Sequence, residues 1–123
     1  MEYRGFRDLI VYQLSYKLAL EIFAHTKSYP KEELFLLTDQ IRRSSRSVPA
    51  NVAEAWRRRK YPKSFVNKLT DSLAEESETE VWLDFSKDLK YITFEKYKYF
   101  TSKYDEVARM LSSMIDNPDK FCQ

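Results

Sequence analysis

Residues 40–60 read QIRRSSRSVPANVAEAWRRRK, and this stretch decides the fold because a proline lies inside an otherwise helical pattern. Pro49 lacks a backbone donor and clashes with the carbonyl of Ser45, so the pattern predicts one helix with a kink at Pro49. The alternative is a break, with Ser47 as the N-cap of a new helix. One apolar face keeps helical spacing on both sides of the proline: Leu34, Leu37, Ile41, Ser44 or Ser45, Val48, Val52 and Ala55.

Three further segments show helical periodicity. The first covers residues 7–27, and Pro30 then suits the first turn of the helix that contains residues 40–60. Pro62 opens a helix that ends near Leu89, and Thr93 is a candidate cap for a last helix that ends at Asn117-Pro118. Short connections make neighbouring helices antiparallel. The sequence predicts an all-α, antiparallel up-down-up-down four-helix bundle, as a single domain over residues 1–123.

The first helical segment carries more apolar surface than one neighbouring helix can cover. A core stripe of Val11, Leu14, Leu18, Ile22 and His25 is accompanied by a second stripe on another side of the helix. Broad burial inside the monomer is one explanation of the second stripe, and a subunit interface is the other. The candidate interface residues are Leu9, Tyr12, Tyr16, Leu20 and Phe23.

The composition limits the kind of protein this is. A chain of 123 residues can bury a core without disulfides or metal, and its one glycine and four prolines provide few turns for a many-stranded sheet. No apolar run reaches the length of a membrane span, and the first residues lack the apolar core of a signal peptide. The one cysteine, Cys122, fits a reducing compartment. We therefore expect a soluble cytoplasmic protein.

Charge is segregated along the chain, although the formal net charge is only +2. Residues 42–68 hold nine Lys or Arg and one carboxylate, whereas residues 71–88 hold seven carboxylates and one Lys. Guanidinium groups beside small residues suit a phosphate backbone. In the alternative interpretation, the basic residues pair with Glu75, Glu78 and Glu80, in the same subunit or the next. The candidate nucleic-acid-binding residues are Arg42, Arg43, Arg46, Arg57, Arg58, Arg59, Lys60 and Lys63.

A polar line runs along the proline-containing helix. Its hydroxyls and amides can satisfy the carbonyl that a kink frees, so a structural hydrogen-bond cluster is a better explanation than an active site. Glu54 and Glu78 are expected to pair with an arginine such as Arg43. Trp56 and Tyr61 could stack on bases, but packing at a helix end is the simpler role. The structural motif comprises Gln40, Ser44, Ser47, Pro49, Asn51, Glu54 and Glu78.

The sequence gives little support to catalysis. His25 is the only histidine and lies on the core stripe, and Glu21 gives it one acidic partner where a di-iron bundle needs several Glu and two Glu-x-x-His units. A single glycine cannot form a glycine-rich phosphate loop. The run EESETE is expected to be solvated or to form ion pairs between subunits. We therefore predict no enzyme activity, no cofactor and no metal site.

The segment LTDQIRRSSRSVPANVAEA resembles the signature of the four-helix-bundle family named for proteins encoded in 23S ribosomal RNA intervening sequences. That bacterial family is itself similar to the accessory proteins of diversity-generating retroelements. The segments FRDLIVYQLS and ARMLSSMI, the E-x-E of Glu78 and Glu80, and Tyr91-Ile92 extend the resemblance along the chain. Two departures are Ala55 and Lys90, which stand where the family usually has glycine. The central residues that match are Gln40, Ile41, Arg42, Arg43, Ser47, Val48, Pro49, Asn51, Val52, Ala53 and Glu54.

The resemblance implies a four-helix bundle that assembles into a homopentamer, with no established catalysis. For the retroelement branch, it implies a basic surface that binds nucleic acid and a reverse transcriptase. Together with the segregated charge, it favours a non-enzymatic, oligomeric accessory protein that binds structured RNA or another nucleic acid. The alternative hypothesis is a protein-interaction or scaffold oligomer, in which the arginines pair with the acidic segment of neighbouring subunits.

Overall fold

The computed structural model describes residues 2–122, which form four long helices and three short 3-10 turns. The prediction of an all-α four-helix fold is confirmed, and residues 2–122 contain no strand. The long helices are α1 (Ile10–Thr26), α2 (Leu37–Arg57), α3 (Pro62–Asp88) and α4 (Phe94–Asp116), and the 3-10 turns are η1 (Phe6–Asp8), η2 (Lys31–Glu33) and η3 (Pro118–Lys120).

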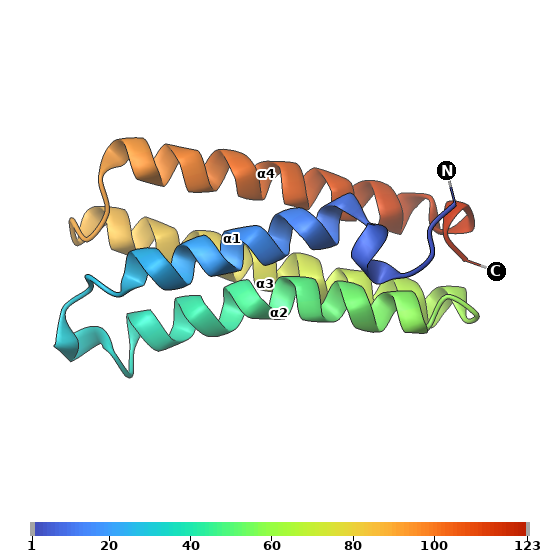
Figure 1. The fold of residues 1–123 in the computed structure, drawn as a ribbon, viewed down its shortest axis with the longest axis horizontal. Helices are drawn as coiled ribbons and strands as arrows, with labels where there is room; N and C mark the ends of the chain where they lie inside the picture. Colours follow the sequence, from blue (N-terminus) through green and yellow to red (C-terminus); the bar gives the residue numbers. More distant parts are fainter. Residues whose placement is uncertain (1, 123) are drawn as a thin grey trace.

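The helices lie side by side along one axis, and Figure 1 shows the chain reversing direction at each connection. Within the described residues, α1 and α3 each contact α2 and α4, while the diagonal pairs do not touch. The N- and C-terminal ends and the connection between α2 and α3 all lie at the same end of the bundle (Figure 1). Residues far apart in the sequence therefore meet at this end.

The core lies between the four helices and follows the predicted periodicity. Apolar side chains from every helix are removed from water, which is the main favourable contribution to folding. Leu14 and His25, which were predicted on the core stripe of the first helix, are only half-buried. The largest buried side chains include Leu18, Ile22, Ile41, Phe65, Leu69, Leu83, Phe100, Tyr104 and Leu111.

Helix α2 begins later than the sequence suggested. Pro30 precedes the 3-10 turn η2, and Leu36 adopts a non-helical backbone conformation (φ −122°, ψ −106°) before α2 starts at Leu37. Leu34, which was predicted on the buried face, is exposed. The boundary carried no sequence signal, because Leu36 has no side-chain oxygen with which to cap the helix.

Helix α2 continues through Pro49, so the alternative of a new helix capped by Ser47 is wrong. The kink itself stays a prediction. Around the proline, Ser47 Oγ donates to the Arg43 carbonyl at 2.9 Å and Asn51 Nδ2 donates to the Ser47 carbonyl at 2.9 Å. From α3, Ser72 Oγ donates to the Val48 carbonyl at 2.8 Å. Side chains thus bind the carbonyls that flank Ser45, whose usual amide partner Pro49 lacks.

Lys90 ends α3 in a left-handed backbone conformation, with φ 65°. The Tyr91 amide donates to the Ser86 carbonyl at 2.8 Å and the Lys90 amide donates to the Lys87 carbonyl at 3.0 Å. This pair of bonds is the Schellman motif, whose left-handed position normally carries glycine. A Cβ atom disfavours that conformation, so the turn forms here at a cost in strain.

Glu76 is a carboxyl group buried in the core, with 1% of its surface exposed. The run EESETE, which was expected to be solvated or to pair between subunits, therefore turns Glu76 and Thr79 inward. Burial, followed by a hydrogen bond and charge repulsion from Glu80 and repulsion from Asp105, raises the pKa of Glu76 from 4.5 to about 9. Burial also raises the pKa of Tyr104, which adjoins Glu76. The native protein therefore holds Glu76 protonated at neutral pH.

We predict that Lys90→Gly stabilises the protein by about 1 kcal/mol and raises Tm by about 3–5 °C, because glycine adopts the left-handed conformation without strain. Urea unfolding measures the effect. Lys90→Ala is the matched control, since it removes the same side chain but keeps Cβ, and its stability should stay near that of the wild type. Equal stabilisation by both variants would contradict the strain argument.

We predict that stability falls as pH rises from about 4.5 towards 9, because the native state keeps a proton on Glu76 that the unfolded chain has released. Glu76→Gln removes this dependence. It should match the wild type near pH 4.5 and be more stable by roughly 1–3 kcal/mol near pH 8. Urea unfolding at several pH values tests this, with exposed Glu106→Gln as the control. The same pH slope in wild type and Glu76→Gln would refute the prediction.

Candidate nucleic-acid interface

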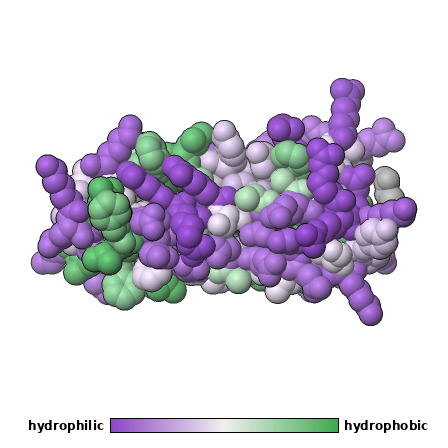
Figure 2. Space-filling view, turned by 90° about the horizontal axis from the view of Figure 1, so that it is seen from below, coloured by the Kyte–Doolittle hydropathy of each residue, from purple (hydrophilic) through white to green (hydrophobic). Residues whose placement is uncertain are grey.

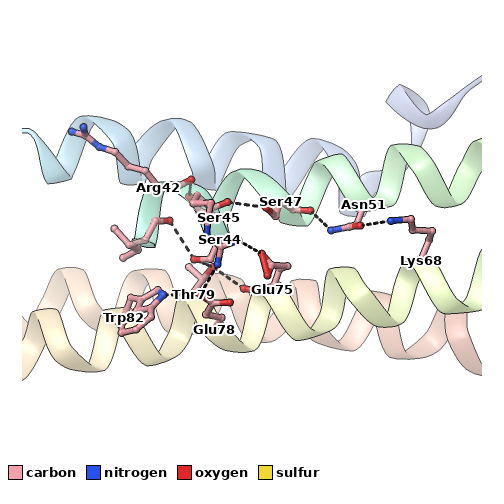
Figure 3. Close-up of polar contacts among 12 residues, drawn as sticks. Arg42, Ser44, Ser45, Ser47, Asn51, Lys68, Glu75, Glu78, Thr79 and Trp82 are labelled. Atoms are coloured by element: carbon pink, nitrogen blue, oxygen red, sulfur yellow. Dashed lines mark hydrogen bonds and ion pairs between the residues drawn. The ribbon is translucent and has the colours of Figure 1, made fainter. Parts of the chain in front are cut away.

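Arg43 on α2 is neutralised by α3 of the same chain (Figure 3). Its Nη2 donates to Glu78 Oε1 at 2.6 Å and its Nη1 donates to Glu75 Oε2 at 3.2 Å. The bond with Glu78 raises the pKa of Arg43, and bonds from Arg43 and Trp82 lower the pKa of Glu78 against the effect of burial. The expected pairing of Arg43 with Glu78 is present. Arg43 as a phosphate contact is corrected, because its donors are already occupied.

Small polar side chains lie behind this ion pair, between α2 and α3. Thr79 Oγ1 donates to Ser44 Oγ at 2.8 Å, and both residues are fully buried (Figure 3). Further along, Lys68 Nζ lies 3.3 Å from Asn51 Oδ1 and 3.7 Å from Glu54 Oε1. Glu54 therefore pairs with a lysine of α3 and not with Arg43. These contacts give the polar line of α2 a structural role.

Arg42 and Arg46 lie over α1. Arg42 Nε donates to Thr26 Oγ1 at 2.8 Å, and its guanidinium lies 4.4 Å from the centre of the Phe23 ring. The guanidinium of Arg46 lies 5.3 Å from the same ring. Arg42 is half-buried and holds the end of α1 against α2, whereas Arg46 is exposed. Of the two, Arg46 is the better placed to meet an external anion.

The remaining basic residues gather where α2 ends and α3 begins. We call Arg57, Arg58, Arg59, Lys60 and Lys63 the basic corner. Arg58 Nη1 donates to Ser64 Oγ at 3.4 Å, and the Arg59 guanidinium lies 3.7 Å from the centre of the Trp56 ring. Among residues 2–122, no carboxylate lies within ion-pair distance of the basic corner. Its positive charge is therefore not neutralised by the described chain.

Two further arginines, Arg4 and Arg7, join the basic corner from the N-terminal segment, and the sequence analysis missed them. Arg4 lines a hollow together with Trp56, Arg57, Arg59 and Lys60. The Arg4 amide donates to Asp8 Oδ2 at 2.7 Å, which ties this segment to η1. The only signal was the pair of arginines in YRGFR, and nothing in the sequence indicated that this segment lies beside residues 56–60.

Trp56 is 7% exposed and Arg59 covers its ring, so the indole packs and offers no open face to a base. Tyr61 remains exposed at the corner.

The predicted interface stripe on α1 divides into buried and exposed residues. Leu9 is 3% exposed, precedes α1 and belongs to the core, so its assignment to an interface is corrected. Tyr12 and Phe23 are half-buried. Tyr16 and Leu20 are exposed, and 58% of the Leu20 surface is accessible. These two residues keep an apolar surface on α1 open to solvent.

A second exposed apolar surface lies at the opposite end of the bundle from the basic corner. Phe35 is 85% exposed, and Leu36, Phe85 and Leu89 are also exposed. With Gln40 and Trp82, they line a hollow of about 400 Å³. Figure 2, seen from below, shows hydrophobic surface gathered toward this end and hydrophilic surface toward the other. The apolar and basic surfaces are thus separated along the long axis.

The residues with catalytic chemistry do not converge on a site. His25 is half-buried against Tyr29 and Phe100, and burial, followed by repulsion from Lys96, lowers its pKa. Burial raises the pKa of the Cys122 thiol, which keeps it protonated at neutral pH. Within residues 2–122, no three His, Cys, Asp or Glu side chains are grouped so that they could hold a metal ion. No helix in that range is both long and apolar enough to cross a membrane.

Comparisons with known proteins agree with this description. The model of a family described as 23S rRNA-intervening sequence protein matches residues 7–113. A crystal structure from Bacteroides thetaiotaomicron VPI-5482, a protein with unknown function from the S23 ribosomal protein family, is similar with 31% identity and a TM-score of 0.78, over 87% of this chain and 96% of that one. A search of curated proteins found no significant match. Neither description names a catalytic activity. Because the family model covers most of its length, the chain belongs to the family of 23S rRNA-intervening sequence proteins.

Proposed function

We propose that this protein is a non-enzymatic, homo-oligomeric protein that binds structured RNA through the basic corner. The observation that carries the proposal is the set of unneutralised cations at one end of the bundle. Arg57, Arg58, Arg59, Lys60 and Lys63 have no carboxylate partner among residues 2–122, and Arg4 lies beside them. The family's name, which refers to ribosomal RNA, supports RNA as the anion.

The chemistry of the basic corner suits phosphate recognition more than base recognition. Guanidinium groups donate paired hydrogen bonds to phosphate oxygens, and release of counterions supplies affinity that does not depend on sequence. The corner offers little for reading bases, because Trp56 is covered and Tyr61 is its one exposed aromatic ring within the described residues. Binding should therefore follow the shape and charge of the RNA.

The homo-oligomer in this proposal rests on two exposed apolar surfaces, Tyr16 with Leu20 on α1 and Phe35 with its neighbours. Large exposed apolar patches commonly mark interaction sites. The resemblance described above suggests five subunits in a ring, which would repeat the basic corner around it. In a retroelement setting, the same basic surface would also contact a reverse transcriptase.

The same apolar surfaces support the second candidate function, a scaffold that binds only proteins. The form of that hypothesis in which arginines meet Glu75 and Glu78 of a neighbour has less support, because Arg43 of the same chain occupies both carboxylates.

We predict that Arg58→Gln combined with Lys63→Gln weakens binding to a structured RNA about tenfold or more, because two phosphate contacts are lost. The slope of log K against log salt should decrease in steepness by about 0.9 for each contact. Fluorescence anisotropy across a salt series measures both quantities. The matched control is Lys103→Gln with Arg109→Gln, which removes the same charge from α4, where both side chains are paired. No RNA binding at low salt, or equal losses in the two double variants, would contradict the proposal.

We predict that the oligomer keeps its mass as salt rises, because apolar contacts are not screened whereas exposed ion pairs are. Light scattering at low and high salt measures the mass. Leu20→Ser and Phe35→Ser each remove an exposed apolar side chain from one of the two surfaces, and the variant that lowers the mass identifies the interface. A monomeric wild type would overturn the oligomer, and dissociation by salt would favour contacts made by ion pairs.

A further inference from the structure

A recess lies within the basic corner, where the N-terminal segment crosses the end of α2. It has a volume of about 490 Å³ and is lined by Arg4, Trp56, Arg57, Arg59 and Lys60. Pockets for small ligands typically measure roughly 300–1,000 Å³. A second hollow of about 310 Å³ adjoins it, because the two share Arg4, Trp56 and Arg57. The surface at this point is therefore concave, with four cationic side chains around one cavity.

Two of the cations are held in place by aromatic rings. Arg59 lies 3.7 Å from the centre of the Trp56 ring, and its Nε is buried with no hydrogen-bond partner among the described residues. The Arg57 guanidinium lies 5.8 Å from the centre of the Phe6 ring. A buried donor without an acceptor costs free energy, and an anion in the recess would supply the acceptors that the protein lacks.

Acidic residues do not compensate this charge. None lines the recess itself. Asp8 lines only the adjoining hollow, and its carboxylate accepts the Arg4 amide at 2.7 Å. Asp8 therefore positions the segment that carries Arg4 and leaves the guanidinium free.

We propose that the recess binds the terminal phosphomonoester of an RNA chain. This inference rests on the proposed function and adds the class of RNA that the basic corner prefers. A terminal phosphate carries about −1.5 to −2 charges at pH 7 and three strong acceptor oxygens, whereas a phosphodiester within the chain carries one charge. Four cations around one cavity favour the more highly charged group.

The shape of the site leads to the same preference. A phosphodiester within a duplex is flanked on both sides by the rest of the chain, so it can lie across the recess but not enter it. A chain end has one neighbour only. The terminal phosphate can occupy the recess beside Arg59, and the adjoining hollow gives room for the nucleotide next to it.

The test compares short single-stranded RNAs of one sequence that differ only at the end, as a 5′-phosphate, a 3′-phosphate or hydroxyls alone. Fluorescence anisotropy at a fixed salt concentration gives each affinity. A phosphate-terminated RNA should bind about tenfold more tightly than the hydroxyl form, the effect of one additional charge-assisted contact. Arg4→Gln and Lys60→Gln should each reduce this ratio to about twofold or less. Arg58→Gln is the matched control, because Arg58 lies in the basic corner but lines neither hollow, and it should weaken all three RNAs equally.

The possible results separate this inference from the proposed function. If all three RNAs bind equally and lose affinity together in the Arg58 variant, the terminal-phosphate site is overturned while RNA binding stands. If none binds even at low salt, both proposals fail. If the ratio persists in Arg4→Gln and Lys60→Gln, the recess is not the site. Competition with a free nucleoside monophosphate checks the source of the phosphate, and displacement at equal concentration would overturn an RNA end as the preferred ligand.

Discussion

The close contact between α2 and α3 is the interaction on which the rest of the structure depends. Its centre is made of short side chains, with Ser44 bonded to Thr79 and Ser72 bonded to the Val48 carbonyl. Short hydroxyl side chains let two helices approach closely and still satisfy their polar atoms. Arg43 closes the exposed edge through Glu75 and Glu78. This contact fixes how α2 is rotated, and with it the direction in which every arginine of α2 points.

That rotation divides the arginines into two groups with different roles. Arg42 and Arg43 join α2 to α1 and α3 and act within the fold. The residues from Arg57 onward lie beyond the contact, at the end of the bundle that the N-terminal segment also reaches. The segregation of charge in the sequence therefore has two causes: part of the basic stretch holds helices together, and the other part is available to a ligand.

The sequence predicted the helices well, because apolar residues at three- and four-residue intervals report burial directly. Thr93 also capped the last helix as expected, with its Oγ1 accepting the Lys96 amide at 3.1 Å. The start of α2 was missed because Leu36 gives no capping signal. Glu76 was missed because a charged residue inside an acidic run has the pattern of a surface, and only the packing around Tyr104 buries it. For the site, the cluster around Arg57 could be foreseen from adjacent letters, but the partners of Arg43 and the presence of Arg4 depend on contacts between distant segments.

The meeting of both chain ends has a consequence for synthesis. Tyr3 packs against Trp56 and against Phe121, with ring centres 5.9 Å and 5.8 Å apart. During translation, residues 4–60 emerge long before Phe121, so the segment that carries Arg4 lacks one side of its support until the last helix leaves the ribosome. The recess reaches its final shape only when residue 121 is free to pack. Recognition of an RNA end would then be a property of completed chains, and a nascent chain would not compete for the same RNA.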